Sequence, residues 1–288
     1  MLKKIKNLFC VESCCGNSCA GSRSEKREIL EMASKEGTLE KLRGPKTKVA
    51  IVTGGCGGIG SAICRYLADD GMHVVVVDLD QTQCDKLAES LSSPSMGLSI
   101  NICDEKAVDE GVKKVVEKFG TVNVLINVAG ILSNNKIQET STSEWNKVMN
   151  VNVTGTFLMT KFVVPHMISQ KWGRIVNLSS WAWKSGGLTA GTVYTTSKGA
   201  VTSFTFSVAR QYADKGITCN AIAPCYVMSK MVSEQLTAKQ RAELLEKIPV
   251  HRFCEPEEIA HCTRFLVHDM SGFITGEVLD VNAGFQMD

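Results

Sequence analysis

Tyr194 and Lys198 lie four positions apart in the stretch YTTSKGA, with mostly small side chains between them. On a helix, positions i and i+4 share one face, so the ammonium would lie beside the phenol. Lowering the pKa of a tyrosine from about 10 to near 7 takes roughly 4 kcal/mol. A positive charge at ~4 Å supplies about that much at an effective dielectric near 20. The pair therefore predicts a tyrosine general acid/base, although taken alone it is more often an ordinary feature of a surface helix.

The elements that would position this pair alternate along the chain from Lys48 onward. Short apolar runs, several of them apolar on both faces like the strands of a buried parallel sheet, are separated by segments with helical periodicity. One such segment, from Ala107 to Phe119, presents a single buried stripe. This alternation predicts an α/β fold of the Rossmann type, a doubly wound parallel sheet of about seven strands with helices on both faces. The predicted strands are residues 48–54, 73–78, 97–102, 122–130, 173–179, 216–223 and 277–282.

A glycine-rich segment, TGGCGGIGSAIC at residues 53–64, follows the first predicted strand directly. Gly54, Gly58 and Gly60 permit a tight turn, a close approach to a pyrophosphate and close packing of the following helix. The N-terminus of that helix presents unpaired amides to the anion. A glycine cluster alone is a weak signal, but this one follows a strand and opens a helix, which is the context of a dinucleotide site.

Asp78 ends the next predicted strand, 18 residues after Gly60. A carboxylate there accepts hydrogen bonds from an adenosine ribose, whereas a 2′-phosphate would meet a like charge with no arginine beside it. The sequence therefore favours NAD(H) over NADP(H), and a positive nicotinamide would help Lys198 to lower the tyrosine pKa. The alternative is that Asp78 only ends a strand or caps the next helix, where Asp80 or Thr82 would serve as well.

Several motifs together resemble the short-chain dehydrogenase/reductase (SDR) family. The resemblance covers Lys48 to about Gly284, and the closing segment is similar to the end of the shorter branch, which includes 3-oxoacyl-ACP reductases and related NAD-dependent alcohol dehydrogenases. The motifs are TGGCGGIG, NVAG (127–130), VNVTG (151–155), GRIVNLSS (173–180), YTTSK (194–198) and NAIAPCYVMS (220–229).

The resemblance implies four catalytic residues. Ser180 would bind and orient the substrate oxygen, and Tyr194 would be the acid/base. Lys198 would lower the tyrosine pKa and hold the nicotinamide ribose, while Asn152, in a helix beginning near Ser143, would anchor a water in a proton relay. Ser180 lies one residue further from the tyrosine than is common, so Ser179 remains an alternative for the serine role.

The resemblance also implies a cofactor site. Asn127 and Gly130 would steady the sheet beside the adenosine ribose, and Val227 and Ser229 would hold the nicotinamide carboxamide. The residues expected to bind the cofactor are Thr53, Gly54, Gly58, Ile59, Gly60, Asp78, Asn101, Ile102, Asn127, Ala129, Gly130, Tyr194, Lys198, Pro224, Val227 and Ser229. Three positions depart from the family pattern: Val128 replaces a frequent Asn, Asn101 replaces the usual Asp, and Cys225 replaces a glycine, which predicts either strain or a different turn shape at the start of the substrate loop.

The expected reaction interconverts a ketone and a secondary alcohol, as in carbonyl reductases and alcohol dehydrogenases. Trp181 and Trp183 would wall the substrate pocket with the loop from residue 226 to about 249, and Lys184 would either attract an anionic group or be a solvated loop cation. An alternative is a 3-oxoacyl-ACP reductase using NADPH, with Lys171 and Lys215 as docking residues. A further alternative, from another class, is a non-catalytic dinucleotide-sensing or structural protein.

The composition of the chain argues against several other classes of protein. Apolar residues make up 44% of the 288 residues and the net charge is +2, which does not indicate a disordered chain or a nucleic-acid binder. No apolar run approaches the length of a membrane span, so a cytoplasmic location is expected, with a small-molecule substrate as partner. The resemblance to the SDR family implies a homotetramer, and the small, apolar surface of GAVTSFTFSVA suits burial between subunits.

Residues 1–46 differ in amino-acid composition from the rest of the chain. They are predicted to form a flexible, cysteine-rich appendage to a single catalytic domain at 47–288. Cys10, Cys14, Cys15 and Cys19 have a spacing that fits no common zinc or cluster template. A disordered reactive tail is therefore expected and no metal site, with metal binding or lipidation beside KKIK as alternatives.

Overall fold

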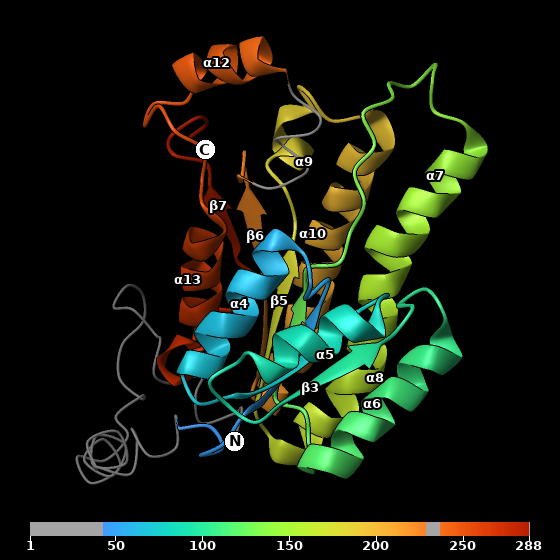
Figure 1. The fold of residues 1–288 in the computed structure, drawn as a ribbon, viewed down its shortest axis with the longest axis vertical. Helices are drawn as coiled ribbons and strands as arrows, with labels where there is room; N and C mark the ends of the chain where they lie inside the picture. Colours follow the sequence, from blue (N-terminus) through green and yellow to red (C-terminus); the bar gives the residue numbers. More distant parts are fainter. Residues whose placement is uncertain (1–42, 229–236, 288) are drawn as a thin grey trace, which may run out of the picture. The chain divides into compact units, whose positions relative to one another are not determined.

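Seven parallel strands form one sheet in the order β3-β2-β1-β4-β5-β6-β7 (Figure 1). This sheet belongs to a computed structural model of the chain that describes residues 43–228 and 237–287. The order reverses between β1 and β4, which opens a crevice at the carboxyl ends of the strands where such folds bind ligands. The predicted fold class is confirmed, whereas nearly all of the predicted appendage at 1–46 lies outside the described residues.

All seven predicted strands form, and β3 is shifted toward the N-terminus from its predicted range of 97–102. It runs from Ser95 to Ser99 because its ladder with β2 begins at Ser95. Ile100 and Ile102 lie beyond the strand, where their side chains are buried in the core. The strands are β1 (Val49–Thr53), β2 (His73–Asp78), β3 (Ser95–Ser99), β4 (Val124–Asn127), β5 (Gly173–Leu178), β6 (Ile217–Pro224) and β7 (Val278–Val281).

Helices cover both faces of the sheet because alternate strand residues point to opposite sides. Ala50 and Val52 of β1 pack in the core beneath α4, α5 and α13, and Val49 and Ile51 pack beneath α6, α8 and α10. No helix in residues 43–228 or 237–287 has the length and hydrophobicity needed to cross a membrane. The helices are α4 (Gly58–Asp69), α5 (Gln81–Glu89), α6 (Glu105–Phe119), α7 (Thr142–Met149), α8 (Gly155–Gln170), α9 (Ala182–Ser185), α10 (Thr192–Tyr212), α12 (Ala238–Lys247) and α13 (Pro256–Val267).

The helix predicted to begin near Ser143 has an unexpected interruption. It starts as α7, passes through a π-helical segment, η1 (Asn150–Thr154), and continues as α8. A π-turn widens a helix by one residue and is often found at functional sites. Here it contains Asn152, one of the predicted catalytic residues.

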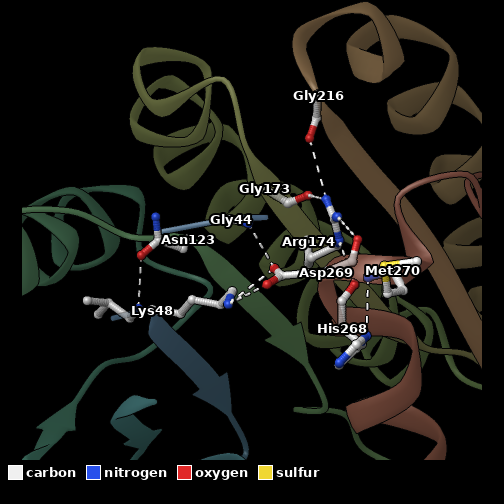
Figure 2. A network of polar contacts seen from close by, with 10 residues as sticks. Gly44, Lys48, Asn123, Gly173, Arg174, Gly216, His268, Asp269 and Met270 are labelled. Atoms are coloured by element: carbon white, nitrogen blue, oxygen red, sulfur yellow. Dashed lines mark hydrogen bonds and ion pairs between the residues drawn. The ribbon is translucent and has the colours of Figure 1, made fainter. Parts of the chain in front are cut away.

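At the amino edge of the sheet, Arg174 of β5 is only 3% exposed. Its guanidinium lies 4.3 Å from the centre of the Trp172 ring. The carboxylate of Asp269 accepts from the backbone N–H of Gly44 and pairs with Lys48 Nζ at 3.2 Å (Figure 2). The arginine donates to the carbonyls of Gly173 (2.9 Å), Asp269 (3.3 Å), Gly216 (3.5 Å) and His268 (3.5 Å). This edge is therefore fastened by polar groups that satisfy one another.

Candidate active site

Tyr194, Lys198 and Ser180 meet at the carboxyl edge of the sheet. The first two lie on α10, and Lys198 Nζ is 5.6 Å from the centre of the tyrosine ring, as their spacing predicted. Ser180 follows β5, and its hydroxyl lies near enough to the Tyr194 phenol to lower the phenol's pKa as a hydrogen-bond partner. Lys198 is 4% exposed, and its ammonium donates to the carbonyl of Leu178 at 2.6 Å. Because an ammonium has three N–H donors and one such acceptor is found among the described residues, two donors are available to a ligand.

Burial shifts the pKa values of both members of this pair. Burial raises the pKa of the Tyr194 phenol above its ordinary value, and the hydrogen bond with Ser180 opposes that rise only in part. Burial also lowers the pKa of the Lys198 ammonium to about 8. Burial opposes the predicted effect of Lys198 and a positive nicotinamide on the tyrosine pKa, because removing a phenolate from water costs free energy. The polypeptide keeps Tyr194 protonated at neutral pH.

Ser179 and Ser180 have separate tasks. The Ser179 hydroxyl is 2% exposed, donates to the carbonyl of Lys198 at 3.2 Å and bonds the Thr202 hydroxyl at 2.9 Å. It therefore fastens β5 to α10. Ser180 accepts from the backbone N–H of Ala182 at 3.2 Å and contacts the tyrosine. This geometry favours Ser180 for the substrate-binding role.

Asn152 fastens the loop after β4 to α10. Its side chain accepts from the N–H of Ile131 at 2.8 Å and donates to the carbonyl of the same residue at 3.0 Å. It also donates to the Ser197 hydroxyl at 2.9 Å, which donates to the carbonyl of Tyr194. A Cβ atom on Gly130 would lie 3.2 Å from Asn152 Oδ1 and 3.5 Å from Lys198 Nζ. The absence of a side chain at position 130 thus keeps the space beside the ammonium open.

The glycine-rich loop has the geometry of an anion site. Gly54 has a φ of 63°, and a Cβ there would lie 2.9 Å from the backbone of Ala129. A Cβ on Gly60 would collide with the carbonyl of Gly54, so α4 packs directly on the turn. Helix α4 begins at Gly58 with no side-chain cap and no acidic residue in its first turn. Its N-terminal amides fit a phosphate, which supports a dinucleotide at this site.

Asp78 faces the glycine-rich loop. Its carboxylate accepts from the backbone N–H of Cys56 at 3.0 Å and from that of Leu79 at 2.8 Å. Asp80, and not Asp78, caps α5 by accepting from Gln83. Within the described residues no lysine, arginine or histidine forms an ion pair with Asp78, and residues 53–60 and 78–82 contain no basic residue.

The other predicted cofactor residues lie along the same edge, and some of their side chains face inward. The Thr53 hydroxyl is buried and accepts from the N–H groups of Val128 and Ala129 at 3.2 Å each. Asn127 is also buried, and its amide donates to Asn177 Oδ1 at 2.9 Å. These two side chains hold neighbouring loops in place.

The predicted adenine-side residues follow β3. Asn101 is exposed, and its side chain accepts from the N–H of Cys103 at 3.1 Å in a local turn. Ile102 is buried in the core, with its side chain close to Gly155. Only the backbone of Ile102 is therefore placed to face a ligand.

The segment after β6 forms without the predicted strain. Among the described non-glycine residues, positive φ occurs only at Lys171, His251 and Ala283, so Cys225 has an ordinary conformation. Its N–H donates to the carbonyl of Val281, and Val227 pairs with Cys254 in a short parallel bridge. Pro224 ends β6, and its carbonyl accepts from the N–H of Trp181. The predicted Ser229 lies outside the described residues.

A cavity of about 180 Å³ opens beside the tyrosine. Its lining is mostly apolar and includes Ile59 of the glycine-rich loop, which joins the two predicted sites. The principal lining residues are Ile59, Leu132, Leu178, Ser180, Trp181, Leu188, Thr189, Ala190, Tyr194, Pro224, Cys225, Tyr226 and Val227.

Two predictions for the pocket wall were wrong. Trp181 lines the cavity, but Trp183 is not among the lining residues. Lys184 is neither a substrate-binding cation nor a solvated one, because its ammonium pairs with Asp280 of β7 at 2.6 Å. The pairing partner is distant in sequence, so local composition gave no sign of it.

The predicted docking lysines are also in the wrong place. Lys171 precedes β5 and Lys215 precedes β6, so both lie near the amino edge of the sheet. The tyrosine lies at the opposite, carboxyl edge. A carrier protein bound at these lysines would not face the cavity.

Lys136 is a positioning residue that the sequence did not indicate. Its ammonium donates to the carbonyls of Gly187 and Ala190, each at 2.7 Å. It therefore holds the loop that brings Leu188 and Thr189 to the cavity. Its only sequence signal is a lysine in a polar loop, which is too common to identify such a role.

Comparisons with known proteins agree with this arrangement. The family model described as Enoyl-(Acyl carrier protein) reductase matches residues 54–286. The chain is 37% identical over 240 residues to 3-oxoacyl-[acyl-carrier-protein] reductase FabG of Thermotoga maritima, which covers 82% of this chain and 97% of that protein. It is 36% identical over 245 residues to (2S)-[(R)-hydroxy(phenyl)methyl]succinyl-CoA dehydrogenase subunit BbsD of Thauera aromatica, over 84% of this chain and 97% of that protein. The solved structure described as "Crystal structure of gox2181" has a TM-score of 0.79 and 31% identity, covering 86% of this chain and 98% of that one.

Proposed function

The chain belongs to the short-chain dehydrogenase/reductase family and is an oxidoreductase acting on CH–OH donors, and from this premise we propose that Tyr194 is its general acid/base in the interconversion of a ketone and a secondary alcohol. The observation that supports this proposal is the meeting of Tyr194, Ser180 and Lys198 beside one cavity that the glycine-rich loop also lines.

In this mechanism the nicotinamide cofactor supplies or accepts the hydride. The hydroxyls of Ser180 and Tyr194 would hold the substrate oxygen, because both residues line the same cavity. In the reductive direction Tyr194 gives its proton to the oxygen as negative charge develops there. Lys198 stabilises the phenolate left behind, and its two available donors would hold the nicotinamide ribose. Asn152 fixes the backbone of α10 below the tyrosine.

We propose that the cofactor is NAD(H) in preference to NADP(H). The Asp78 carboxylate ends β2 beside the glycine-rich loop, and it has no cationic partner in the described part of the chain. A ribose hydroxyl donates to such a carboxylate, whereas a 2′-phosphate would be repelled. NADPH stays the alternative that goes with a 3-oxoacyl-ACP reductase.

The substrate is proposed to carry its ketone or hydroxyl next to an apolar group, because the cavity lining is mostly apolar. The names of two relatives describe enzymes acting on acyl thioesters, one of a carrier protein and one of coenzyme A. A 3-oxoacyl thioester is therefore a second candidate, although Lys171 and Lys215 do not support carrier docking. A non-catalytic role is the third alternative, and the complete set of Ser180, Tyr194, Lys198 and Asn152 argues against it.

A panel of ketones, secondary alcohols and 3-oxoacyl thioesters tests the proposal, with nicotinamide absorbance followed for NAD(H) and NADP(H) separately. We expect turnover of at least one ketone–alcohol pair and a higher kcat/KM with NAD(H). Binding of NADH with no turnover of any member would contradict the catalytic proposal and favour a sensing role.

We also propose a homotetramer. Helices α8 and α10 expose aromatic side chains on their outer faces: Phe157 is 45% exposed and Phe206 is 47% exposed. Phe157 also contacts Phe204 edge-on across the two helices. Exposed aromatic surface shared by two long helices is typical of an interface between subunits. Sedimentation equilibrium should give a tetramer, and a stable monomer would reject the proposal.

A further inference from the structure

Four aromatic side chains from distant segments form an aromatic partition behind the cavity. Trp181 and Tyr226 line the cavity itself. The ring of Phe285, near the C-terminus, lies edge-on to Trp181 at 4.8 Å and 6.4 Å from Tyr226. Phe253 contacts Tyr226 at 6.2 Å. Edge-to-face packing of this kind fixes ring orientation, so the shape of the cavity wall depends on residues outside it.

The C-terminal tail, defined here as residues 282–287, is folded onto this partition. Strand β7 ends at the carboxyl edge of the sheet, so the tail begins there (Figure 1). Ala283 and Gly284 both have positive φ, of 55° and 75°, which turns the chain back on itself. Asn282 holds the turn by donating to the carbonyl of Gln286 at 2.8 Å. The side chain of Gln286 then accepts from the indole N–H of Trp181 at 2.6 Å.

A second cavity lies on the far side of the partition. It has a volume of about 440 Å³, and it shares Cys225 and Tyr226 with the first cavity. Its other walls include the backbone turn of the tail at Asn282 to Gly284. The hydroxyl of Tyr226 also hydrogen-bonds the hydroxyl of Thr189 at 3.1 Å, which joins two parts of the wall of the first cavity. A substrate chain that outgrows the first cavity therefore meets Tyr226 and Trp181.

We propose that the C-terminal tail sets the upper size limit of the substrate, with Phe285 and Gln286 acting as positioning residues that hold Trp181 in the wall of the first cavity and Tyr226 between the two cavities. This inference rests on the proposed function, because it assigns the first cavity to the substrate. Phe285 packs against a small cluster around Leu244 and Phe253, apart from the two main cores. Its truncation should therefore open the wall and leave the fold intact.

The test compares Phe285→Ala with Phe285→Leu and with Met287→Ala, a control in the same tail whose side chain is 84% exposed. The substrates are N-acetylcysteamine thioesters of 3-oxobutanoate, 3-oxooctanoate and 3-oxododecanoate. We expect Phe285→Ala to lower KM for the longest thioester by about tenfold relative to the shortest, with kcat for the shortest unchanged. Phe285→Leu should restore most of the original preference, and Met287→Ala should keep it. Uniform loss of kcat for all lengths, or an unchanged length profile, would overturn the inference.

A binding measurement separates this inference from the catalytic proposal. The three thioesters are titrated against each protein by isothermal calorimetry in the presence of NAD, so that no hydride can reach the ketone. Phe285→Ala should bind the longest thioester about tenfold more tightly than the original protein does, and its tryptophan emission should shift as Trp181 loses its partners. If the original protein reduces none of the ketones but this length shift appears, the catalytic proposal fails and the inference stands. An identical length dependence of binding in both proteins overturns the inference whatever the turnover.

Discussion

The two edges of the sheet bury the same kind of group and use it differently. Arg174 at the amino edge and Lys198 at the carboxyl edge are 3% and 4% exposed. The arginine donates to four backbone carbonyls and stacks on Trp172, whereas the lysine donates to one carbonyl among the described residues. A buried cation whose N–H groups are hydrogen-bonded to the protein stabilises the structure. A buried cation with N–H groups that the protein does not use can bind a ligand or take part in catalysis.

The carboxylates of the two edges repeat this contrast. Asp269 pairs with Lys48 at the amino edge, while Asp78 at the carboxyl edge accepts only from backbone N–H groups in the described part of the chain. Asp269 therefore meets a cation, whereas Asp78 and Lys198 at the carboxyl edge form no ion pair among the described residues. Because they do not pair with each other, Lys198 and Asp78 can bind different parts of one ligand. The comparison predicts that substitutions at the amino edge change stability and those at the carboxyl edge change activity.

The largest effect should come from Tyr194→Phe, which removes the proton donor and keeps the ring. We expect kcat to fall by about 10²–10⁴-fold with NADH affinity nearly unchanged, because general acid–base catalysis contributes about this factor. Single-turnover kinetics and NADH fluorescence titration provide the two measurements. Tyr212→Phe, on the same helix but at its other end, is the matched control and should retain activity. Equal turnover by the Tyr194 variant would refute the mechanism.

At the amino edge, Arg174→Met should lower the free energy of unfolding by about 3 kcal/mol, because buried carbonyls lose their donor. Urea denaturation measures this loss, and kcat/KM per folded molecule should stay within about twofold. Arg65→Met, at an exposed arginine, should change stability by less than about 0.5 kcal/mol. The contrast between the edges would break if Arg174→Met reduced activity without reducing stability.

The sequence was sufficient for features that depend on local pattern. All seven strands and the pairing of Tyr194 with Lys198 on one helical face follow from periodicity. The SDR motifs identified the family. These features depend on short-range geometry, which one stretch of chain contains by itself.

Features that depend on distant partners were missed. Lys184 pairs with Asp280, nearly a hundred residues away, and no local pattern announces that contact. The π-helical segment that contains Asn152 was likewise not indicated by any local pattern. The burial that raises the pKa of the Tyr194 phenol was also missed, because the surrounding fold determines it.

The pH dependence of stability offers a smaller test at Lys198. Burial lowers the pKa of its ammonium from the ordinary value near 10.5 to about 8. Between these values the unfolded chain binds a proton that the folded chain has lost, so stability rises with pH through this window. Lys198→Met lacks this contribution. As the pH rises from about 7 to about 10, the free energy of unfolding of the original protein should therefore increase by about 2 kcal/mol relative to that of Lys198→Met. Parallel pH profiles in urea denaturation would contradict this account of a buried, partly satisfied cation.

The smallest effect concerns the separated carboxylate. Asp78→Asn keeps the size and one acceptor oxygen but removes the charge that would repel a 2′-phosphate, so the ratio of kcat/KM for NADP to that for NAD should rise by about tenfold. Asp80→Asn is the matched control, because it retains the helix cap of α5 and its carboxylate is already bonded to Gln83. Asp269→Asn should leave the cofactor ratio unchanged while it weakens the pair with Lys48. If Asp78→Asn left the ratio where it was, the charge at this position would have no part in cofactor choice. The preference for NAD would then have to come from the shape of the glycine-rich loop, and the two edges would differ only in their cations.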